Sequence, residues 1–466
     1  MNPNSAEAYF IRGSVRLQLG NTQGAIDDSN LAIKINPNST YAYFLRGGTR
    51  KVLGDKQGAI DDFNQAIKIN PNFFYDYFLR GFVRFQLGDK PGAIDDFNQA
   101  IKINPNYANA YYCRGNVRND LGDKQGAIDD YNQAIKFNPN DAYAYSNRGN
   151  VRDELGDKQG AIDDFNQAIK INPNDANAYY FRGNVRNDLG DKQGAIDDYT
   201  QAIKINPNYA YAYKSRGNAR SELGDKQGAI DDYTQAIKIN PNDANAYYFR
   251  GNARSELGDK QGAIDDYTQA IKINPNDANA YYFRGNVRSE LGDKPGAIDD
   301  FNQAIKFNPN DAYAYFLRGL VRFQLGDKQG AIDDYTQAIK INPNYAYAYY
   351  FRGNVRSELG DKQGAIDDFN QAIKINPNDA YAYYFRGNVR SELGDKQGAI
   401  DDFNQAIKIN PNDAYAYHGR GNAKSALGNK QGAIADFQQA VKLYQQQGGN
   451  EYWLRIAQDR IRELQQ

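Results

Sequence analysis

Four residue types that often build reactive sites are almost missing from this sequence of 466 residues, which contains one His, one Cys, one Met and one Trp. A single His and a single Cys cannot form a His/Cys metal cluster, and one Cys cannot form a disulfide within the chain. Catalysis by a histidine general base has little scope for the same reason. We therefore expect no metal, no cofactor and no enzymatic activity.

The sequence also lacks an excess of either charge and any long apolar run. Lys and Arg number 56 against 57 Asp and Glu, so no overall basic field attracts nucleic acid. No segment approaches the roughly 18–20 apolar residues of a membrane span. The amino terminus shows no signal-peptide pattern. These absences predict a cytoplasmic protein that binds neither nucleic acid nor membranes.

What the sequence has instead is a strict internal repeat. Glycines and the tripeptide Asn-Pro-Asn return every 34 residues without an insertion or deletion. Counting repeat positions from Ala6, we predict thirteen copies within residues 1–443 and a distinct tail at 444–466. Because glycine and proline recur at fixed positions, they mark turns and do not indicate a disordered chain. The tripeptides start at residues 2, 36, 70, 104, 138, 172, 206, 240, 274, 308, 342, 376 and 410.

The sixth copy, residues 176–209, shows how each repeat is expected to fold. Its first half reads as a helix that ends at Gly190, a residue suited to the left-handed backbone that follows a helix. Asp191 can cap a second helix, whose apolar residues recur at helical spacing until Pro207 stops it. The small side chain of Gly183 lets the two helices approach closely. The pattern predicts an antiparallel helix hairpin in every copy.

The pattern resembles the tetratricopeptide repeat (TPR): 34 residues, with an aromatic residue at position 4, Gly at 8, Ala at 20, an aromatic residue at 24, Ala at 27 and Pro at 32. The resemblance covers residues 2–443, and the near-identical copies look like TPR arrays common in cyanobacteria. It implies an all-α fold, an α-solenoid of hairpins in a right-handed superhelix, with thirteen repeats and a C-terminal capping helix. It further implies that the first helices line a concave groove.

Two arginines per repeat depart from the usual TPR pattern. Arg stands at position 7 in all copies and at position 11 in all but the last, as in Arg182 and Arg186. These positions are neighbours on one helix face, so the two charges would repel unless a negative group lies between them. The second helix supplies Asp197 and Asp198, and we expect an Arg–Asp network between the helices of each repeat. The alternative is a strip that binds phosphate or carboxylate.

If the family geometry holds, repeat positions 2, 5, 9, 12 and 13 face the groove. Asn at position 9 can bond an extended peptide backbone without reading its sequence, and Tyr at position 5 offers rigid contact area. Asp or Glu at position 13 favours a partner with basic residues. The alternative is that these side chains are only solvated or pack between repeats. The predicted groove residues are Asn116, Asn150, Asn184, Asn218, Asn252, Asn286, Asn354, Asn388, Asn422, Tyr180, Tyr248 and Tyr282.

Copies three and ten break this pattern with apolar side chains at positions 5, 9 and 12. An apolar cluster on a polar surface usually marks a contact site. The alternative is that an apolar variant was copied without consequence. The predicted patches are Phe78, Phe82 and Phe85 in copy three, and Phe316, Leu320 and Phe323 in copy ten.

The two ends of the array are irregular. Ser29 replaces the aromatic residue at position 24 of the first copy, as expected of a terminal repeat. After the last copy, Gly448 and Gly449 interrupt the chain. Asn450 can then cap a final helix whose apolar side is anchored by Trp453. This segment is predicted to cap the array.

Single residues point to no catalytic or known ligand motif. We expect Cys113 to be a packed thiol and His418 to be a groove contact. The TPR clamp for chaperone carboxylates is matched by Lys214 and Asn218 but not by Phe249, which occupies the next clamp position. Binding of chaperone tails is therefore not expected.

These observations predict a non-enzymatic scaffold that binds a protein or extended peptide in its groove. The first alternative is a structural spacer that associates with itself, or a designed repeat array. The second is a carbohydrate-binding protein, because Tyr, Asn and acidic side chains also suit sugars.

Overall fold

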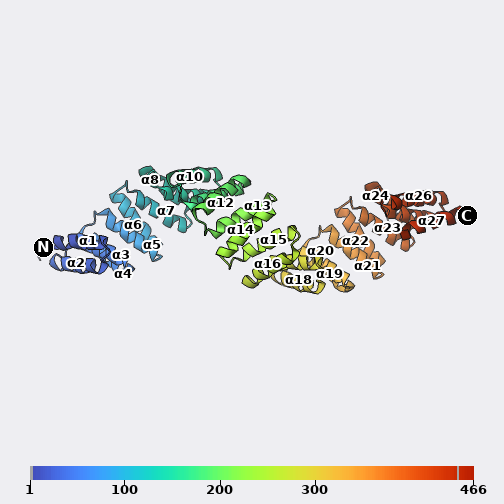
Figure 1. Ribbon diagram of the computed structural model, residues 1–466, viewed down its shortest axis with the longest axis horizontal. Helices are drawn as coiled ribbons and strands as arrows, with labels where there is room; N and C mark the ends of the chain where they lie inside the picture. The colour runs from blue at the N-terminus through green and yellow to red at the C-terminus, as the bar shows by residue number, and fades with distance from the viewer. Residues whose placement is uncertain (1–3, 449–450) are drawn as a thin grey trace. The chain divides into compact units, whose positions relative to one another are not determined.

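The computed structural model describes residues 4–448 and 451–466, and these ranges contain helices and no strand. The chain divides into two compact units, Met1–Asn240 and Pro241–Gln466. Within each unit, helix hairpins follow one another in chain order, as the labels in Figure 1 show. The all-α, hairpin-repeat fold expected from the sequence is confirmed.

The described residues of the first unit form fourteen helices, two from each of seven copies. They are α1 (Ala6–Gln18), α2 (Thr22–Ile35), α3 (Thr40–Val52), α4 (Lys56–Ile69), α5 (Phe74–Gln86), α6 (Lys90–Ile103), α7 (Ala108–Asp120), α8 (Lys124–Phe137), α9 (Ala142–Glu154), α10 (Lys158–Ile171), α11 (Ala176–Asp188), α12 (Lys192–Ile205), α13 (Ala210–Glu222) and α14 (Lys226–Ile239).

The described part of the second unit holds the helices of copies eight to thirteen and a final helix. They are α15 (Ala244–Glu256), α16 (Lys260–Ile273), α17 (Ala278–Glu290), α18 (Lys294–Phe307), α19 (Ala312–Gln324), α20 (Lys328–Ile341), α21 (Ala346–Glu358), α22 (Lys362–Ile375), α23 (Ala380–Glu392), α24 (Lys396–Ile409), α25 (Ala414–Ala426), α26 (Lys430–Gln446) and α27 (Glu451–Gln465).

The turn inside each hairpin forms for the reasons the sequence suggests. In copy six, Gly190 has φ of +85°, a backbone conformation that side chains disfavour. Asp191 then caps α12 by accepting a hydrogen bond from the Gly194 amide at 2.9 Å. A Cβ added to Gly194 would lie 2.1 Å from the Asp191 carboxylate, so the cap itself requires glycine there. The second helix ends just before Asn206, which precedes Pro207.

Each hairpin closes around one aromatic ring from its second helix. In copy six this ring is Tyr199, which is almost fully buried between Ala195 and Ala219 of the next copy. A Cβ on Gly183 would approach the Tyr199 ring to 2.7 Å, which explains why glycine stands at this position. Small side chains therefore let large rings fill the space within and between hairpins.

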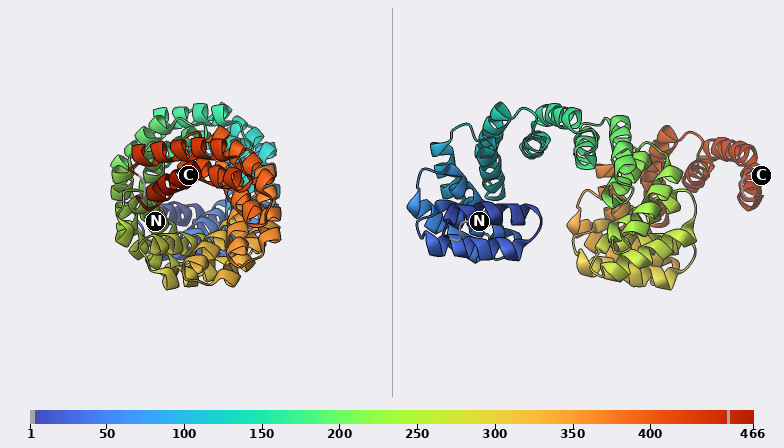
Figure 2. Two further views of the ribbon diagram at one scale, coloured as in Figure 1. Left: turned by 90° about the vertical axis from the view of Figure 1, so that its right-hand side faces the viewer. Right: turned by 60° about the vertical axis from the view of Figure 1, so that its left-hand side comes forward.

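The first helices form the inner face of each unit. Neighbouring first helices contact one another, as α5 and α7 do in the first unit and α23 and α25 in the second. Among the described helices, no neighbouring pair of second helices makes comparable contact. Figure 2 shows the hairpins of each unit side by side. Because the first helices are closer together, side chains that point away from the second helices lie on the concave side.

The final helix covers the last hairpin. Trp453 of α27 packs against Tyr415 and His418, and Ala457 is fully buried against α26. This arrangement confirms the predicted cap and its tryptophan anchor. Gly448 has φ of +61°, whereas Gly449 and the predicted Asn450 cap lie outside the described residues. Within the ranges that the structure covers, no helix has the length and apolar character that crossing a membrane requires.

Candidate functional site

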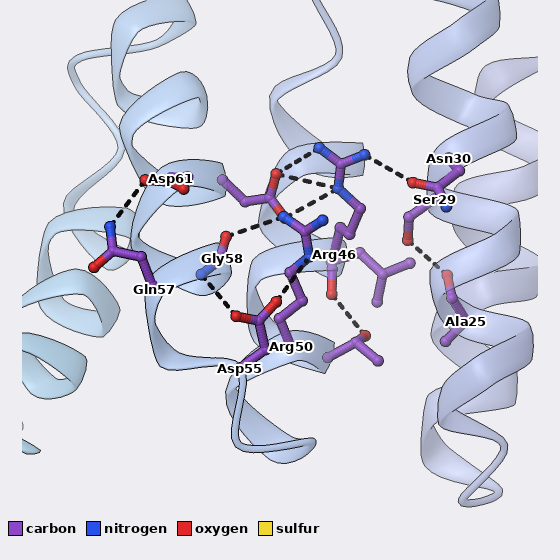
Figure 3. Close-up of polar contacts among 12 residues, drawn as sticks. Ala25, Ser29, Asn30, Arg46, Arg50, Asp55, Gln57, Gly58 and Asp61 are labelled. Atoms are coloured by element: carbon purple, nitrogen blue, oxygen red, sulfur yellow. Dashed lines mark hydrogen bonds and ion pairs between the residues drawn. The ribbon is translucent and has the colours of Figure 1, made fainter.

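The invariant arginines hold each repeat together and also join it to the repeat before. Figure 3 shows this arrangement in copy two, where Arg46 of α3 bonds Asn30 of α2 and Arg50 lies beside Asp55 and Gly58. Arg46 also pairs with the buried Asp62 of α4. One side chain thus contacts three helices.

The same geometry in copy six gives the distances of the network. Asp198 accepts from Nε and Nη2 of Arg182 at 2.9 and 2.5 Å, and from Nη1 of Arg186 at 3.0 Å. The Asp198 side chain is only 3% exposed. Arg182 further donates to Asn166 of copy five at 2.7 Å and lies over the Tyr179 ring. The buried carboxylate separates the two like charges, as the predicted network requires.

Every copy contains this network, so the arginines pair with aspartates of the array itself and do not form a free anion-binding strip. The aspartate at position 23 pairs with both cations in each copy, and in the last copy Lys424 takes the place of the second arginine. The preceding aspartate, Asp197 in copy six, is exposed and accepts a hydrogen bond from Gln193 of its own helix. The sequence could not decide between these two adjacent carboxylates.

The predicted row of asparagines is half-buried in eight of nine cases, and only Asn422 is exposed. Four of them have a structural partner that the sequence did not reveal. Each accepts a hydrogen bond, at 2.8–2.9 Å, from the tyrosine at position 24 of its own copy. These four are Asn116, Asn184, Asn218 and Asn252. In copies five, nine, eleven and twelve position 24 is Phe, so Asn150, Asn286, Asn354 and Asn388 lack this bond. Part of this row of asparagines therefore serves to accept hydrogen bonds from buried tyrosine hydroxyls.

The predicted groove tyrosines are also part of the packing. Tyr180, Tyr248 and Tyr282 are half-buried, and each ring lies about 6 Å from the ring at position 24 of its own repeat. Burial raises the pKa of Tyr248 and of Tyr282. These side chains support the inner face and expose only part of their surface to a ligand.

Two residues of the predicted apolar patches are not on the surface. Phe78 is 9% exposed and packs against Phe97 and Tyr107, whereas Phe316 is 8% exposed and packs against Tyr335 and Tyr345. The prediction of a surface role for these two residues is wrong, because position 5 points at the ring of the second helix. They belong to the core.

The remaining patch residues are half-buried on the inner face: Phe82, Phe85, Leu320 and Phe323. The ammonium of Lys51 lies 4.3 Å from the centre of the Phe82 ring, and burial lowers the pKa of this lysine. In copy ten, Leu320 occupies the position where Asn accepts from tyrosine in other copies. As a result, the hydroxyl of the fully buried Tyr335 has no hydrogen-bond partner.

Each irregular copy is followed by a cavity on the inner face. Phe85 forms one wall of a cavity of about 290 Å³, and Phe323 forms the same wall of a cavity of about 330 Å³. The first is lined by Phe85, Asn116, Asn119, Asp120, Tyr131, Asn147 and Asn150. The second is lined by Phe323, Phe351, Asn354, Val355, Ser357, Glu358, Phe369, Phe385, Asn388, Val389 and Glu392.

The acidic side chains at position 13 have partners that the sequence did not reveal. The lysine that starts the second helix of the preceding copy pairs with them, as Lys158 does with Asp188 at 2.7 Å and Lys192 with Glu222 at 2.6 Å. These carboxylates remain about half exposed, so the pairs are weak. The row is thus less strongly negative than its sequence suggests.

Comparison with known proteins decides the family. Models of the tetratricopeptide repeat match residues 6–39, 40–73, 142–175, 346–379, 380–413 and 414–447, and a further TPR model matches 83–122 and 115–156. Together these segments span more than half of the chain. The chain belongs to the TPR family. A model named ETO1 C-terminal domain matches the intervening residues 175–355 of this TPR protein.

Several solved structures resemble parts or most of this TPR chain. MamA shares 28% identity over 35% of this chain and 96% of its own, with a TM-score of 0.34. YrrB, described as a TPR protein with an unusual peptide-binding site, shares 24% over 40% of this chain and 95% of its own, with a TM-score of 0.37. Yeast Tom70 shares 16% over 91% of this chain and 96% of its own, with a TM-score of 0.36. No curated protein matches the sequence.

Three irregular positions of this TPR protein also carry buried ionisable side chains, Asp76, Cys113 and His418. Asp76 is fully buried without a hydrogen-bond partner at a position that holds Ala in the other copies, and burial raises its pKa to about 7. His418 is 5% exposed beneath α27, and burial lowers its pKa to about 4. The expected groove contact of His418 is therefore wrong. Cys113 is the packed thiol expected, with a pKa raised to about 12 by burial.

TPR repeats generally serve as scaffolds for protein–protein interaction, which is the function that the family assignment supports. Within residues 4–448 and 451–466, no group of three or more His, Cys, Asp and Glu side chains is placed to hold a metal ion.

Proposed function

We propose that this TPR protein is a non-enzymatic scaffold that binds a protein or an extended peptide along the inner faces formed by its first helices. The observation that carries the proposal is the pair of cavities on those faces, each beside a copy that breaks the repeat. Concave sites with an apolar floor and a few polar groups are where ligands usually bind.

The division of labour among residues supports the same function. The side chains that recur in every copy, such as Arg182 and Asp198, are used in holding the helices together. The side chains that vary, such as Phe85 and Phe323, project into the cavities. A surface of this kind keeps its backbone geometry constant while local side chains choose the partner.

Direct mapping of a bound peptide tests the proposal. A phage library of random 12-residue peptides is panned against the full chain, with the bare support as control. Selected peptides carrying a photo-crosslinking residue are then attached to the protein, and the site is found by mass spectrometry. We expect crosslinks to the first helices. Failure to enrich any peptide, or crosslinks confined to the second helices, would contradict the proposal.

The apolar patch of copy three can be tested against a protein partner. For a partner recovered by affinity purification, the double variant Phe82→Asn/Phe85→Ser should lose at least tenfold in affinity, because these half-buried rings supply the apolar contact. Unchanged binding would remove this patch from the binding surface.

Self-association is the second candidate, and one observation favours it. Ile11 and Val15 of α1 are 54% and 48% exposed, whereas the residue equivalent to Val15 in copy six, Val185, is buried against Phe165 of copy five. Exposed apolar side chains on one helix face favour contact with another copy. Light scattering decides this point: a mass that rises with concentration supports self-association, and a constant monomer mass excludes it.

A further inference from the structure

The cavity between copies eleven and twelve combines aromatic walls with a rim of carboxylates and amides. Phe323 of α19 forms one wall, and Phe351 of α21, Phe369 of α22 and Phe385 of α23 supply further rings. The cavity measures about 330 Å³, at the small end of the range for ligand sites, so it has room for one large side chain of a peptide. The chemistry of the lining residues therefore indicates which kind of side chain the cavity accepts.

The only charged residues that line this cavity are Glu358 and Glu392. Lys328 bonds Glu358 at 2.9 Å and Lys362 bonds Glu392, but neither lysine lines the cavity. The two carboxylates are 47% and 57% exposed, so these ion pairs are weak and each carboxylate keeps lone pairs for another donor. The rim is suited to a cationic group.

The aromatic rings that line the cavity favour arginine over lysine as the cationic side chain. A guanidinium group is planar, less strongly hydrated than an ammonium, and stacks on aromatic faces. Its five donors can reach a carboxylate and an amide oxygen together, and Asn354 and Asn388 supply such oxygens on the same rim. An ammonium group would gain less from the rings and lose more hydration.

We infer that this cavity binds the arginine side chain of a peptide ligand, between the rings of Phe323 and Phe385 and the carboxylates of Glu358 and Glu392. The inference rests on the proposed function and adds the residue type that the inner face selects.

The cavity after copy three shows why the same preference does not extend to it. That cavity also has Phe at position 12 as a wall, but it is lined by one carboxylate, Asp120, and, in addition to Asn116, by Tyr131 and Asn147. Both donate to the Asn116 oxygen, at 2.8 and 2.9 Å, so this acceptor is already used. The two cavities occupy equivalent places but differ in chemistry, which makes one a control for the other.

The experiment uses peptides selected on the full chain from the random library and made as fluorescent synthetic peptides. We expect arginine to be enriched at one position, and replacement of that arginine by citrulline, its neutral isostere, to weaken binding at least tenfold in fluorescence anisotropy. Lysine at that position should bind more weakly than arginine. The variant Glu358→Gln/Glu392→Gln should bind the arginine and citrulline peptides equally.

Single variants test whether the arginine side chain binds in this cavity. Phe323→Ser should weaken arginine-peptide binding at least tenfold, since Ser stands at this position in copies eleven to thirteen, whereas Phe307→Ser, at the end of the second helix α18, should leave it unchanged. Circular dichroism checks that both variants fold. Peptides selected without arginine, or an arginine whose binding depends on Phe85 and not on Phe323, would overturn the inference while leaving the proposed function intact. If no peptide is selected at all, the proposed function itself fails.

Discussion

At the scale of single residues, buried polar side chains differ in whether a neighbouring side chain bonds them, and copies three and ten each hold one that has no partner. Tyrosine at position 24 occurs with Asn at position 9 in copies four, six, seven and eight, and the two side chains bond each other. Copy ten keeps the tyrosine but has Leu320, and copy three buries Asp76 with no partner. An unpaired polar group costs stability when it is buried.

The orphaned phenol of Tyr335 predicts a stabilising substitution. Leu320→Asn should raise the free energy of unfolding by about 1 kcal/mol, because it supplies the acceptor that other copies have. Urea unfolding measures the change.

The reverse substitution offers a matched pair of controls. Asn184→Leu should cost about 1–3 kcal/mol because it removes the oxygen that accepts from the buried Tyr199 hydroxyl. Asn150→Leu should cost less, since position 24 of that copy is Phe165. Equal effects at the two sites would show that the hydrogen bond is unimportant.

Replacing the buried Asp76 by alanine should stabilise the protein by an amount that depends on pH. Its pKa is about 7 in the folded chain against an ordinary value of 3.8, so between these values the unfolded chain has lost a proton that the folded chain retains. The free energy of unfolding therefore falls as pH rises from about 4 to about 7. Asp76→Ala removes this loss, so its stabilisation should be larger at pH 8 than at pH 4. Thermal unfolding at the two pH values checks this, with the exposed Asp61→Ala as control.

At the scale of helices, the Arg–Asp network is the strongest polar link between elements. Asp198→Ala should destabilise copy six by about 3 kcal/mol or more, because it leaves Arg182 and Arg186 without their shared partner. Asp197→Ala, one residue away, should change stability by less than about 0.5 kcal/mol because that side chain is exposed. Chemical denaturation compares the two variants. A larger effect at Asp197 would contradict the network.

The capping helix has its own pH dependence. His418 lies beneath α27 with a pKa of about 4 against 6.5 when unfolded, and Arg460 of α27 also disfavours its charge. As pH falls from about 6.5 to 4, the unfolded chain gains a proton that the folded chain excludes, so the cap loses stability. The fluorescence of Trp453, the single tryptophan, should report melting at lower temperature at pH 5 than at pH 7.5. His418→Phe should remove most of this difference.

The helices could be predicted from the sequence because each boundary depends on local residues, as Gly190, Asp191 and Pro207 show. The Arg–Asp network could also be predicted, since a pair of like charges demands a counter-charge nearby. The burial of Phe78 and Phe316 could not, because it depends on which way position 5 points relative to the second helix. The Lys–Glu pairs were missed because they join different copies.

At the scale of the whole molecule, charges cancel within each repeat and the invariant side chains are occupied in packing. Stability in such an array is approximately a sum over repeats and their neighbouring interfaces. Function then depends on the few copies that differ, and copies three and ten supply the phenylalanines that form a wall of each cavity. We therefore propose that positions shared by all copies hold the fold, whereas irregular positions bind the partner.

Amide hydrogen exchange of the full chain, with and without a library-selected arginine peptide, tests this claim most directly. Protection should increase in α21 and α23, which carry most of the cavity lining, and stay unchanged in second helices far from the cavity. Protection that is absent, or that appears only along the second helices, would contradict the claim.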